Sequence, residues 1–452
     1  MVGCAWASGL PMRSPVHEDE RKALLTSREA LKPDSYFFVK YRLTPAEGLS
    51  LEEAAARVSI VSTLRTMRRL TYEAVRARIQ NAGLITSLDN SGYVEVAFPL
   101  AQCSEREGLT HLLLLITAGA EYNYTRTFWI ESLELPENFV RRYKGPRFGK
   151  SGIQDVFKAS SRPILGLVIK PRTGVGLNQI LNVCDEALRG GADFIVDDLL
   201  LIDPDGELSF ENRVKPFVAL AKSVSNATKQ EKKYFVNVGI ASHKAAEYAL
   251  SGVASGVGAV LVNAFTMGIG GVEHVVESLN GAVPVIATNM GSGIMTRGSL
   301  LGSAAVFPTG MSEAVVAKLS RIAGADAAHT GTSASECYGE DAWGPPARAL
   351  LHQLFDLRPA MPVAEGDLTV ANFWHNVRSL GRDILVEPTS GIVDFPGGPR
   401  KGAAAFRQLA ESLDPEMDAE TADKTIRQIA KKHSFSEALT FFGYNPREWS
   451  KT

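Results

Sequence analysis

The sequence has few cysteines, and none is placed where a cysteine-based site would need it. Its four cysteines, Cys4, Cys103, Cys184 and Cys337, are far apart and form no CxxC or CxxH pair. This spacing argues against a zinc site and against a disulfide framework. We therefore expect a reducing, cytoplasmic environment.

An excess of charge of one sign is also missing. The chain has 48 basic and 50 acidic residues, with a formal net charge of -2. Such a balance gives no broad field that would attract nucleic acid or an anionic membrane. The chain also lacks an apolar run of about 18 residues, the length of a spanning helix, and a basic-then-apolar export signal. We expect no nucleic-acid partner, no membrane and no export.

The length of 452 residues is too great for one ordinary core, so the sequence predicts two domains with tails. The expected segments are a polar extension (1–34), an α+β domain (35–144), a larger domain (145–415) and a helical tail (416–452). Within the α+β domain, strand-like and helix-like runs follow one another in the order β-α-β-β-α-β. That order is typical of a ferredoxin-like fold.

In the larger domain, eight short apolar runs alternate with segments of helical period. The runs are 164–169, 194–198, 235–238, 259–262, 283–287, 327–330, 361–364 and 384–386. Almost continuously apolar strands are covered on both faces, as in a parallel (β/α)8 barrel. Periodicity alone leaves a doubly wound open sheet as the alternative.

Polar residues follow these apolar runs, where the active sites of such barrels lie. The ring comprises Lys170, Arg172, Asp197, Asp198, Asn237, Asn263, Asn289, His329, Glu365, Asp367, Glu387 and Ser390. Any one member has a plain interpretation as a hydrogen bond or salt bridge of the barrel rim. The whole ring favours a ligand site.

Several motifs resemble the RuBisCO large-chain family in order and spacing. They are GPRFGKSGIQ (145–154), GLVIKPRTGVG (166–176), GGADFIVDD (190–198), AGADAAHTGT (323–332) and GGPRKGAAAFRQ (397–408). The resemblance covers about residues 35 to 415. It implies a ferredoxin-like domain, a TIM barrel, and a homodimer whose active site takes N-terminal-domain residues from the partner chain.

The chain departs from this family at its metal site. The family has a carbamylated lysine, two aspartates and a glutamate after the second strand, and three of these groups hold Mg2+. Here the lysine position is Val196, the aspartates are Asp197 and Asp198, and the glutamate position is Leu199. A hard divalent cation needs several oxygen ligands, so no cofactor is expected, and Mg2+ only through a site unlike the family's.

Other functional positions differ as well. The family's His-Arg pair after the fifth strand is replaced by Thr288 and Asn289, and the mobile-loop lysine by Glu336. Glu365 stands in place of the serine of a Ser-Gly-Gly turn. A phosphate beside Glu336 and Glu365 would meet a repulsion of about 1 kcal/mol per pair of unit charges at 4 Å in water, and more in a cleft. Two phosphates on one substrate are therefore not expected.

Lys170 matches the lysine that moves protons at the family's reacting carbon. Its plainer interpretation is an ion pair with Asp198, which is compatible with a catalytic role. Arg172 and His329 match anion-binding positions, and the Ser390-Gly391 turn offers backbone N–H groups to an anion. Asp197 and Asn289 complete the candidate ligand site.

Three functions follow from these residues. The leading hypothesis is a RuBisCO-like protein of form IV, an isomerase or lyase that transfers protons without a metal on a small carbonyl or monophosphorylated compound. The catalytic residues would be Lys170, Asp198 and His329. The second hypothesis is a homodimer that binds a metabolite without catalysis, and a retained carboxylase is a minor third. A metal bound by the new acids, among them Glu365 and Glu387, is a further alternative.

Overall fold

The computed structural model describes residues 16–65, 80–159, 162–297, 299–301, 304–306, 309–333 and 343–446. The chain divides into two compact units, one of Met1–Phe139 with Met295–Ser312 and one of Val140–Ile294 with Glu313–Thr452. Residues 295–312 thus join the first unit, whereas the boundaries expected from the sequence place them in the barrel domain. The physical reason is β12 (Gly310–Met311), which pairs with β4 (Thr125–Glu134) in parallel.

The first unit is a five-stranded sheet in the order β12-β4-β1-β3-β2. Its other strands are β1 (Tyr36–Pro45), β2 (Leu84–Leu88) and β3 (Tyr93–Pro99), and β1 runs antiparallel to both β3 and β4. The helices of this unit include α1 (Glu18–Leu24), α2 (Leu51–Leu64) and α4 (Gly108–Thr117). The expected order of strands and helices is therefore present in the described residues, with Ser50 capping α2 through Glu53 N–H.

One expected strand starts later than its sequence pattern indicates. The run 78–88 predicts a strand, but residues 80 and 81 are helical and β2 begins only at Leu84. Short 3-10 turns connect the longer elements of this unit: η1 (Arg28–Ala30), η2 (Pro33–Ser35), η3 (Leu100–Gln102) and η4 (Ala118–Glu121).

The second unit is a closed parallel barrel of eight strands, ordered β13-β14-β15-β5-β6-β7-β8-β9. The strands are β5 (Ile164–Ile169), β6 (Phe194–Asp197), β7 (Lys233–Asn237), β8 (Ala259–Asn263), β9 (Val285–Thr288), β13 (Ala327–His329), β14 (Met361–Glu365) and β15 (Leu385–Glu387). The fold class inferred from the sequence is confirmed, and the open doubly wound sheet is excluded by the pairing of β15 with β5.

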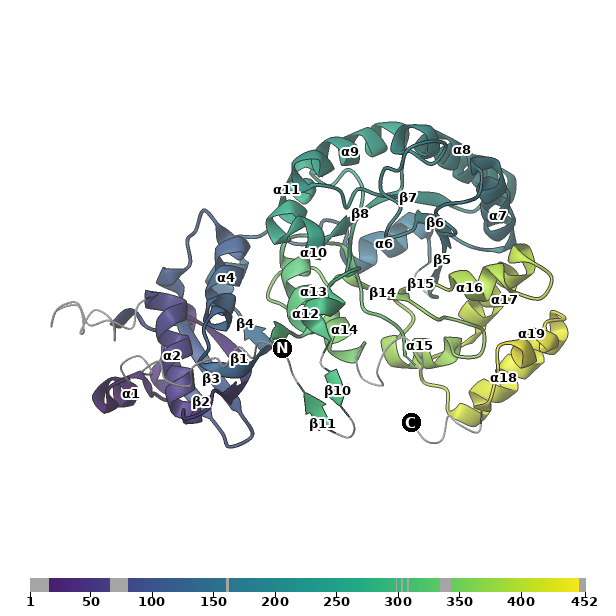
Figure 1. The fold of residues 1–452 in the computed structure, drawn as a ribbon. Coiled ribbons are helices and arrows are strands. Elements are labelled where there is room, and N and C mark those ends of the chain that lie inside the picture. Colours follow the sequence, from purple (N-terminus) through teal and green to yellow (C-terminus); the bar gives the residue numbers. More distant parts are fainter. Residues whose placement is uncertain are drawn as a thin grey trace, which may run out of the picture. The chain divides into compact units, whose positions relative to one another are not determined.

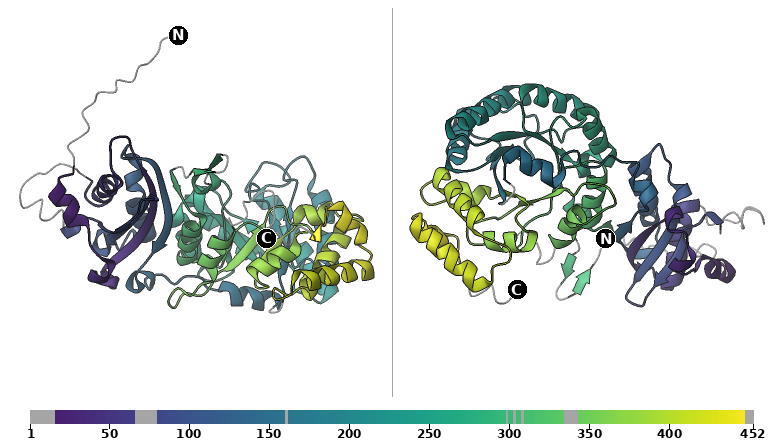
Figure 2. Two further views of the ribbon diagram at one scale, coloured as in Figure 1. Left: turned by 90° about the horizontal axis from the view of Figure 1, so that it is seen from below. Right: turned by 180° about the vertical axis from the view of Figure 1, so that it is seen from behind.

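Helices surround these strands in a ring, which Figures 1 and 2 show from opposite ends of the barrel. The surrounding helices are α7 (Leu177–Gly190), α8 (Phe210–Thr228), α9 (Ser242–Ser255), α10 (Ala264–Met267), α11 (Ile269–Leu279), α13 (Glu313–Ile322), α14 (Gly344–Leu351), α15 (Phe373–Leu380), α16 (Thr389–Val393) and α17 (Pro399–Ser412). Helix α6 (Gly149–Phe157) lies across the barrel instead and adds Ile153 and Phe157 to its core. Helices α18 (Ala419–Lys432) and α19 (Ser436–Phe441) follow α17 on the outside. The remaining short elements are α5 (Glu137–Val140), α12 (Gly293–Thr296), β10 (Ser299–Leu301) and β11 (Ala304–Val306).

The barrel interior is filled by buried apolar side chains rather than by an open channel. Phe194 and Phe235 stack with ring centroids 4.4 Å apart, and Phe157 of α6 lies 6.1 Å from each of them. Gly166 of β5 lies against this stack, because a Cβ there would come within 2.2 Å of the Phe194 ring. Such packing fixes the strands, so the residues at their carboxyl ends have defined positions. In the part of the chain that is described, no helix has the length and apolar character needed to cross a bilayer.

Candidate active site

Five charged side chains lie at the carboxyl ends of five consecutive strands of the barrel. They are His329 of β13, Glu365 of β14, Glu387 of β15, Lys170 directly after β5 and Asp198 directly after β6. Parallel strands present their carboxyl ends at the same rim, so these side chains gather in one sector of the barrel mouth. These members of the expected ring are therefore concentrated in one sector, whereas Asn237, Asn263 and Asn289 lie at the ends of β7, β8 and β9.

Lys170 lies between Asp198, which follows β6, and Glu365 of β14. Its Nζ atom lies 3.7 Å from Asp198 Oδ2 and 3.5 Å from Glu365 Oε1. The ion pair with Asp198 that the sequence suggests is thus present, together with a second one. The side chain of Lys170 is 46% exposed, so water screens both pairs and the ammonium group remains accessible from outside.

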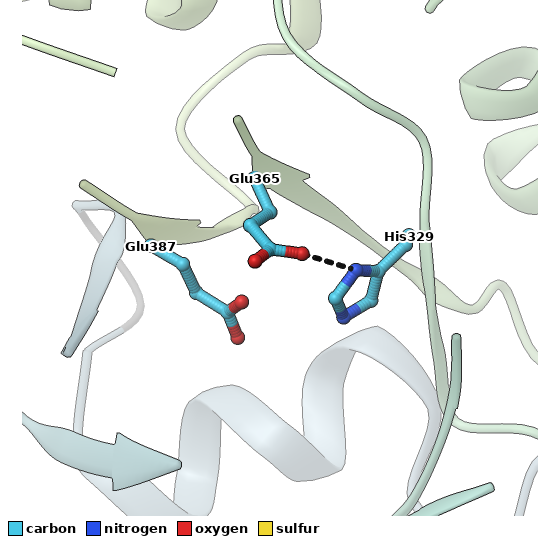
Figure 3. A group of neighbouring side chains, drawn as sticks. All are labelled: His329, Glu365 and Glu387. Carbon is cyan, nitrogen blue, oxygen red and sulfur yellow. Dashed lines mark ion pairs between the residues drawn. The ribbon is translucent and has the colours of Figure 1, made fainter. Parts of the chain in front are cut away.

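His329, Glu365 and Glu387 form a compact group beside Lys170 (Figure 3). His329 Nδ1 lies 3.1 Å from Glu365 Oε2, and the two side chains are 2% and 14% exposed. The carboxyl group of Glu387 points toward the other two side chains in Figure 3. Two buried atoms of the group, His329 Nε2 and Glu387 Oε2, have no hydrogen-bond partner among the described residues.

The three residues influence one another's protonation. Burial opposes the charged form of His329, but the contacts with Glu365 and the charge of Glu387 outweigh it and raise the pKa of His329. Burial also opposes ionisation of Glu365, yet its hydrogen bond with His329 and the charge of Lys170 lower the pKa of Glu365. Burial raises the pKa of Glu387 to about 7, because the attraction of His329 compensates only part of the desolvation.

A pocket of about 260 Å³ opens onto this group. Its lining comprises Lys170, Pro171, Glu365, Gly366, Asp367, Glu387, Thr389, Ser390, Val393 and Asp394. Four of these side chains carry carboxyl groups and one carries an amine, so the lining attracts cations more than anions. This charge balance agrees with the expectation that a bisphosphate is a poor ligand.

Asp197 does not belong to the ligand site, which corrects the expectation from the sequence. Its carboxylate is fully buried and accepts hydrogen bonds from Arg213 of α8, the Tyr234 hydroxyl and the Asn237 backbone N–H. Arg213 Nη2 lies 2.8 Å from Asp197 Oδ2. Val196, the residue before Asp197, lies in the barrel core, so Asp197 points outward toward α8. Asp197 therefore stabilises the packing of α8 against β6.

The other candidate residues lie in varied surroundings. Arg172 is exposed and does not line the pocket, whereas Ser390 lines it. Gly391 is buried, and a Cβ there would come within 2.5 Å of the Leu368 carbonyl oxygen. Asn289 donates from its side-chain amide to Glu313 Oε2 at 3.5 Å and lies outside the pocket lining. Glu336 lies outside the described residues.

Glu387 is more central than the sequence indicated. It directly follows the last apolar run and belongs to the expected polar ring, but the sequence favours the Ser390-Gly391 turn as the ligand-binding part of that segment. The signal that identifies it is a carboxylate at the last residue of a buried strand, where only 3% of Glu387 is exposed. A buried acid without an ion pair calls for an explanation.

Comparison with known proteins gives a family match over the barrel that carries these residues. Residues 150–442 match the family model "Ribulose bisphosphate carboxylase large chain, catalytic domain". The chain belongs to the RuBisCO large-chain family.

Its relatives carry two kinds of name. The chain is 29% identical over 419 residues to "Ribulose bisphosphate carboxylase" of Archaeoglobus fulgidus, covering 87% of this chain and 91% of that one. It is 27% identical over 347 residues to "Ribulose bisphosphate carboxylase-like protein" of the same organism, covering 76% and 75%. Among solved structures, "Dimeric Archeal Rubisco from Hyperthermus butylicus" matches with a TM-score of 0.81 at 23% identity, covering 94% and 100%. The family is therefore defined, while the activity is not defined by these names.

The residues at the positions of the family's magnesium site differ from the family's ligands. At the position of the carbamylated lysine, Val196 is 1% exposed and packs in the barrel core with Leu199, which stands at the glutamate position. Asp198 alone keeps an oxygen donor, and its Oδ1 accepts a hydrogen bond from Leu200 N–H at 2.8 Å. These donors do not fit a magnesium ion held as in the family.

Proposed function

We propose that this chain is a RuBisCO-like protein of form IV that transfers protons next to the carbonyl group of a small compound and does not fix carbon dioxide. The observation that carries the proposal is the position of Lys170. Its amine reaches the pocket at the rim where the barrel's site residues gather, while Val196 and Leu199 provide no ligands for the family's magnesium. Enolisation needs a base at the reacting carbon and a positive partner for the oxygen.

In the proposed reaction, Lys170 Nζ in its amine form removes a proton from the carbon beside the carbonyl. The C–H bond breaks, its electron pair forms the enolate, and the negative charge collects on the carbonyl oxygen. Return of a proton to the same carbon exchanges it with solvent. If the reacting carbon carries a hydroxyl group, a proton can instead be added to the former carbonyl carbon while the hydroxyl proton moves to the former carbonyl oxygen, and this completes an isomerisation. His329 and Arg172 are the positive groups that the sequence assigns to the oxygen, and His329 is held in place by Glu365.

The test is exchange of substrate protons with solvent deuterium. Purified protein would be incubated in D2O with a panel of hydroxy-ketones and 2-oxo acids, with and without a phosphate group, and exchange would be followed by NMR. We expect exchange with at least one compound, and a loss of about 100-fold or more in Lys170→Met, since general acid-base catalysis contributes 10²- to 10⁴-fold. The matched control is Lys215→Met, because Lys215 is exposed on α8.

A second candidate function is supported by the two ion pairs of Lys170. With Asp198 and Glu365 both nearby, its charge is compensated, which suits a protein that binds a metabolite without catalysis. A ligand that raises the melting temperature equally in wild type and Lys170→Met, with no exchange in either, would favour this candidate. Exchange that persists in Lys170→Met would exclude Lys170 as the base.

A further inference from the structure

The group at the end of β13, β14 and β15 has the dimensions of a metal centre. His329, Glu365 and Glu387 each offer one ligand atom, and these atoms all lie within 4.8 Å of one another. Metal bonds of about 2.1 Å place tetrahedral ligand atoms about 3.4 Å apart, so a shift of about an ångström would close the group around an ion. Glutamate side chains reach such shifts by small changes of their torsion angles.

A second observation points to a ligand in this place. Glu387 is only 3% exposed, and its Oε2 atom has no hydrogen-bond partner among the described residues. Figure 3 shows that this carboxyl group is directed toward His329 and Glu365. His329 is 5% exposed, and its Nε2 atom also has no hydrogen-bond partner in the described parts of the chain. Buried polar atoms without partners are costly, and an ion or a polar ligand removes the cost.

The charges around the group favour a cation. Asp367 and Asp394 line the same pocket as Glu365 and Glu387, and Lys170 is the single basic residue among the described residues that line it. An ion with two positive charges, bound by a neutral imidazole and two carboxylates, leaves the three ligands and the ion neutral together. The buried site would then hold no uncompensated charge.

We propose that His329, Glu365 and Glu387 bind one divalent transition-metal ion, with open coordination positions facing the pocket. One imidazole nitrogen and two carboxylate oxygens suit Zn2+, Mn2+, Fe2+ or Co2+ better than Mg2+, which prefers oxygen ligands alone. The site is distinct from the family's magnesium position, because its ligands come from β13, β14 and β15 rather than from β6.

The role of the ion rests on the proposed function, whereas its binding does not. Next to Lys170, the ion would polarise the carbonyl oxygen of the substrate while Lys170 removes the proton from the adjacent carbon. It would provide the positive partner of the enolate oxygen in place of His329. A substrate with a carbonyl and a neighbouring hydroxyl group can chelate such an ion, and it needs no phosphate.

The test begins with binding in the absence of any substrate. The full chain would be treated with EDTA, dialysed, and titrated with Co2+ by calorimetry and visible absorption, and metal content after purification would be measured by mass spectrometry. We expect one Co2+ per chain, with absorption bands of a low-symmetry Co2+ site and a higher melting temperature. Absence of stoichiometric Co2+ and Zn2+ binding would overturn the inference.

Three variants separate this site from general attraction by an acidic pocket. Glu387→Gln is expected to weaken Co2+ binding by about 100-fold or more, since loss of even an outer hydrogen-bonding partner costs 10- to 100-fold. Asp394→Asn is the matched control, because Asp394 lines the pocket outside the group and its loss removes the same charge. Equal weakening in both variants would contradict the proposal. Lys170→Met should tighten binding, because it removes a positive charge 3.5 Å from Glu365.

The two proposals can fail separately. If the EDTA-treated chain binds no Co2+ but exchanges carbonyl-adjacent protons at the full rate, the ion inference is wrong and the proposed function stands. If Co2+ binds with the expected pattern of variants but no compound exchanges, the proposed function is wrong and the ion site stands.

Discussion

Two adjacent aspartates at the end of β6 are both buried but differ in their partners. Asp197 is fully buried and bonded to Arg213, Tyr234 and the Asn237 backbone, whereas Asp198 pairs with the half-exposed Lys170. We predict that Asp197→Asn lowers the free energy of unfolding by about 3 to 5 kcal/mol, because it leaves Arg213 charged and buried. Asp198→Asn should cost below about 1 kcal/mol. Urea denaturation measures both, and equal losses would refute the assignment of Asp197 to the scaffold.

The alternation of side chains along β6 predicts the different positions of Asp197 and Asp198. Side chains alternate between the two faces of a strand, and Phe194 and Val196 both lie in the barrel core. Asp197 must therefore point outward, while Asp198 follows the end of the strand. The contacts of Lys170 and Glu387 could not be obtained in this way, because they depend on how close neighbouring strand ends come.

Glu273 of α11 gives a prediction for the pH dependence of stability. Burial, followed by repulsion from Glu277, raises the pKa of Glu273 from 4.5 to about 7. The folded chain then holds this proton more tightly than the unfolded chain, so the contribution of Glu273 is complete below about pH 4.5 and is lost as the pH rises to about 7. Glu273→Gln should therefore gain stability relative to wild type between pH 5 and about pH 8. Chemical denaturation at both pH values tests this, with Glu247→Gln, at an exposed residue of α9, as control.

At the scale of elements, Gly166 shows how closely the barrel strands pack. A Cβ at Gly166 would lie 2.2 Å from the Phe194 ring, in a core where Phe194 stacks on Phe235. We predict that Gly166→Ala lowers the free energy of unfolding by about 1 to 3 kcal/mol, the range for overpacked cores. Gly176→Ala is the control, because the nearest atom to its Cβ would be the Glu207 carboxylate at 3.3 Å. Similar losses in the two variants would contradict the packing argument.

Most of the barrel could be predicted because each strand is a separate apolar run. The expected run 164–169 coincides with β5, and 361–364 lacks only Glu365 of β14. Such runs are buried on both faces and stand out from the amphipathic helices between them. Pairing of β12 with β4 could not be predicted, because a two-residue strand has no local pattern and exists only through its partner. The start of β2 differs from the expected strand 78–88 because residues 80 and 81 are helical and only the run from Leu84 pairs with β3.

At the scale of the whole molecule, we predict a homodimer. The expectation comes from the family resemblance, in which the N-terminal domain of one chain completes the active site of another. Light scattering coupled to size-exclusion chromatography should give a mass of about twice the 48.8 kDa of one chain. A monomer at concentrations where proton exchange is observed would show that each chain has a complete site.

The absence of the family's carbamate predicts an insensitivity to bicarbonate. Val196 cannot react with carbon dioxide, so bicarbonate added to Mg2+ should not raise the melting temperature beyond the effect of Mg2+ alone. The quantity compared is the difference in melting temperature between Mg2+ with bicarbonate and Mg2+ alone. Any Mg2+ that binds elsewhere affects both samples equally. A bicarbonate-dependent increase would restore the carboxylase hypothesis.

Closure of the barrel makes β15 a neighbour of β5, although the two strands lie at opposite ends of this unit's sequence. Lys170 and Asp198 are synthesised before His329, Glu365 and Glu387. The group of five side chains can therefore form only after the ribosome has added Glu387. A nascent chain that ends before Glu387 lacks one of the five side chains of the candidate site, however well its earlier strands have folded. Appearance of ligand binding would thus mark the docking of the last strand.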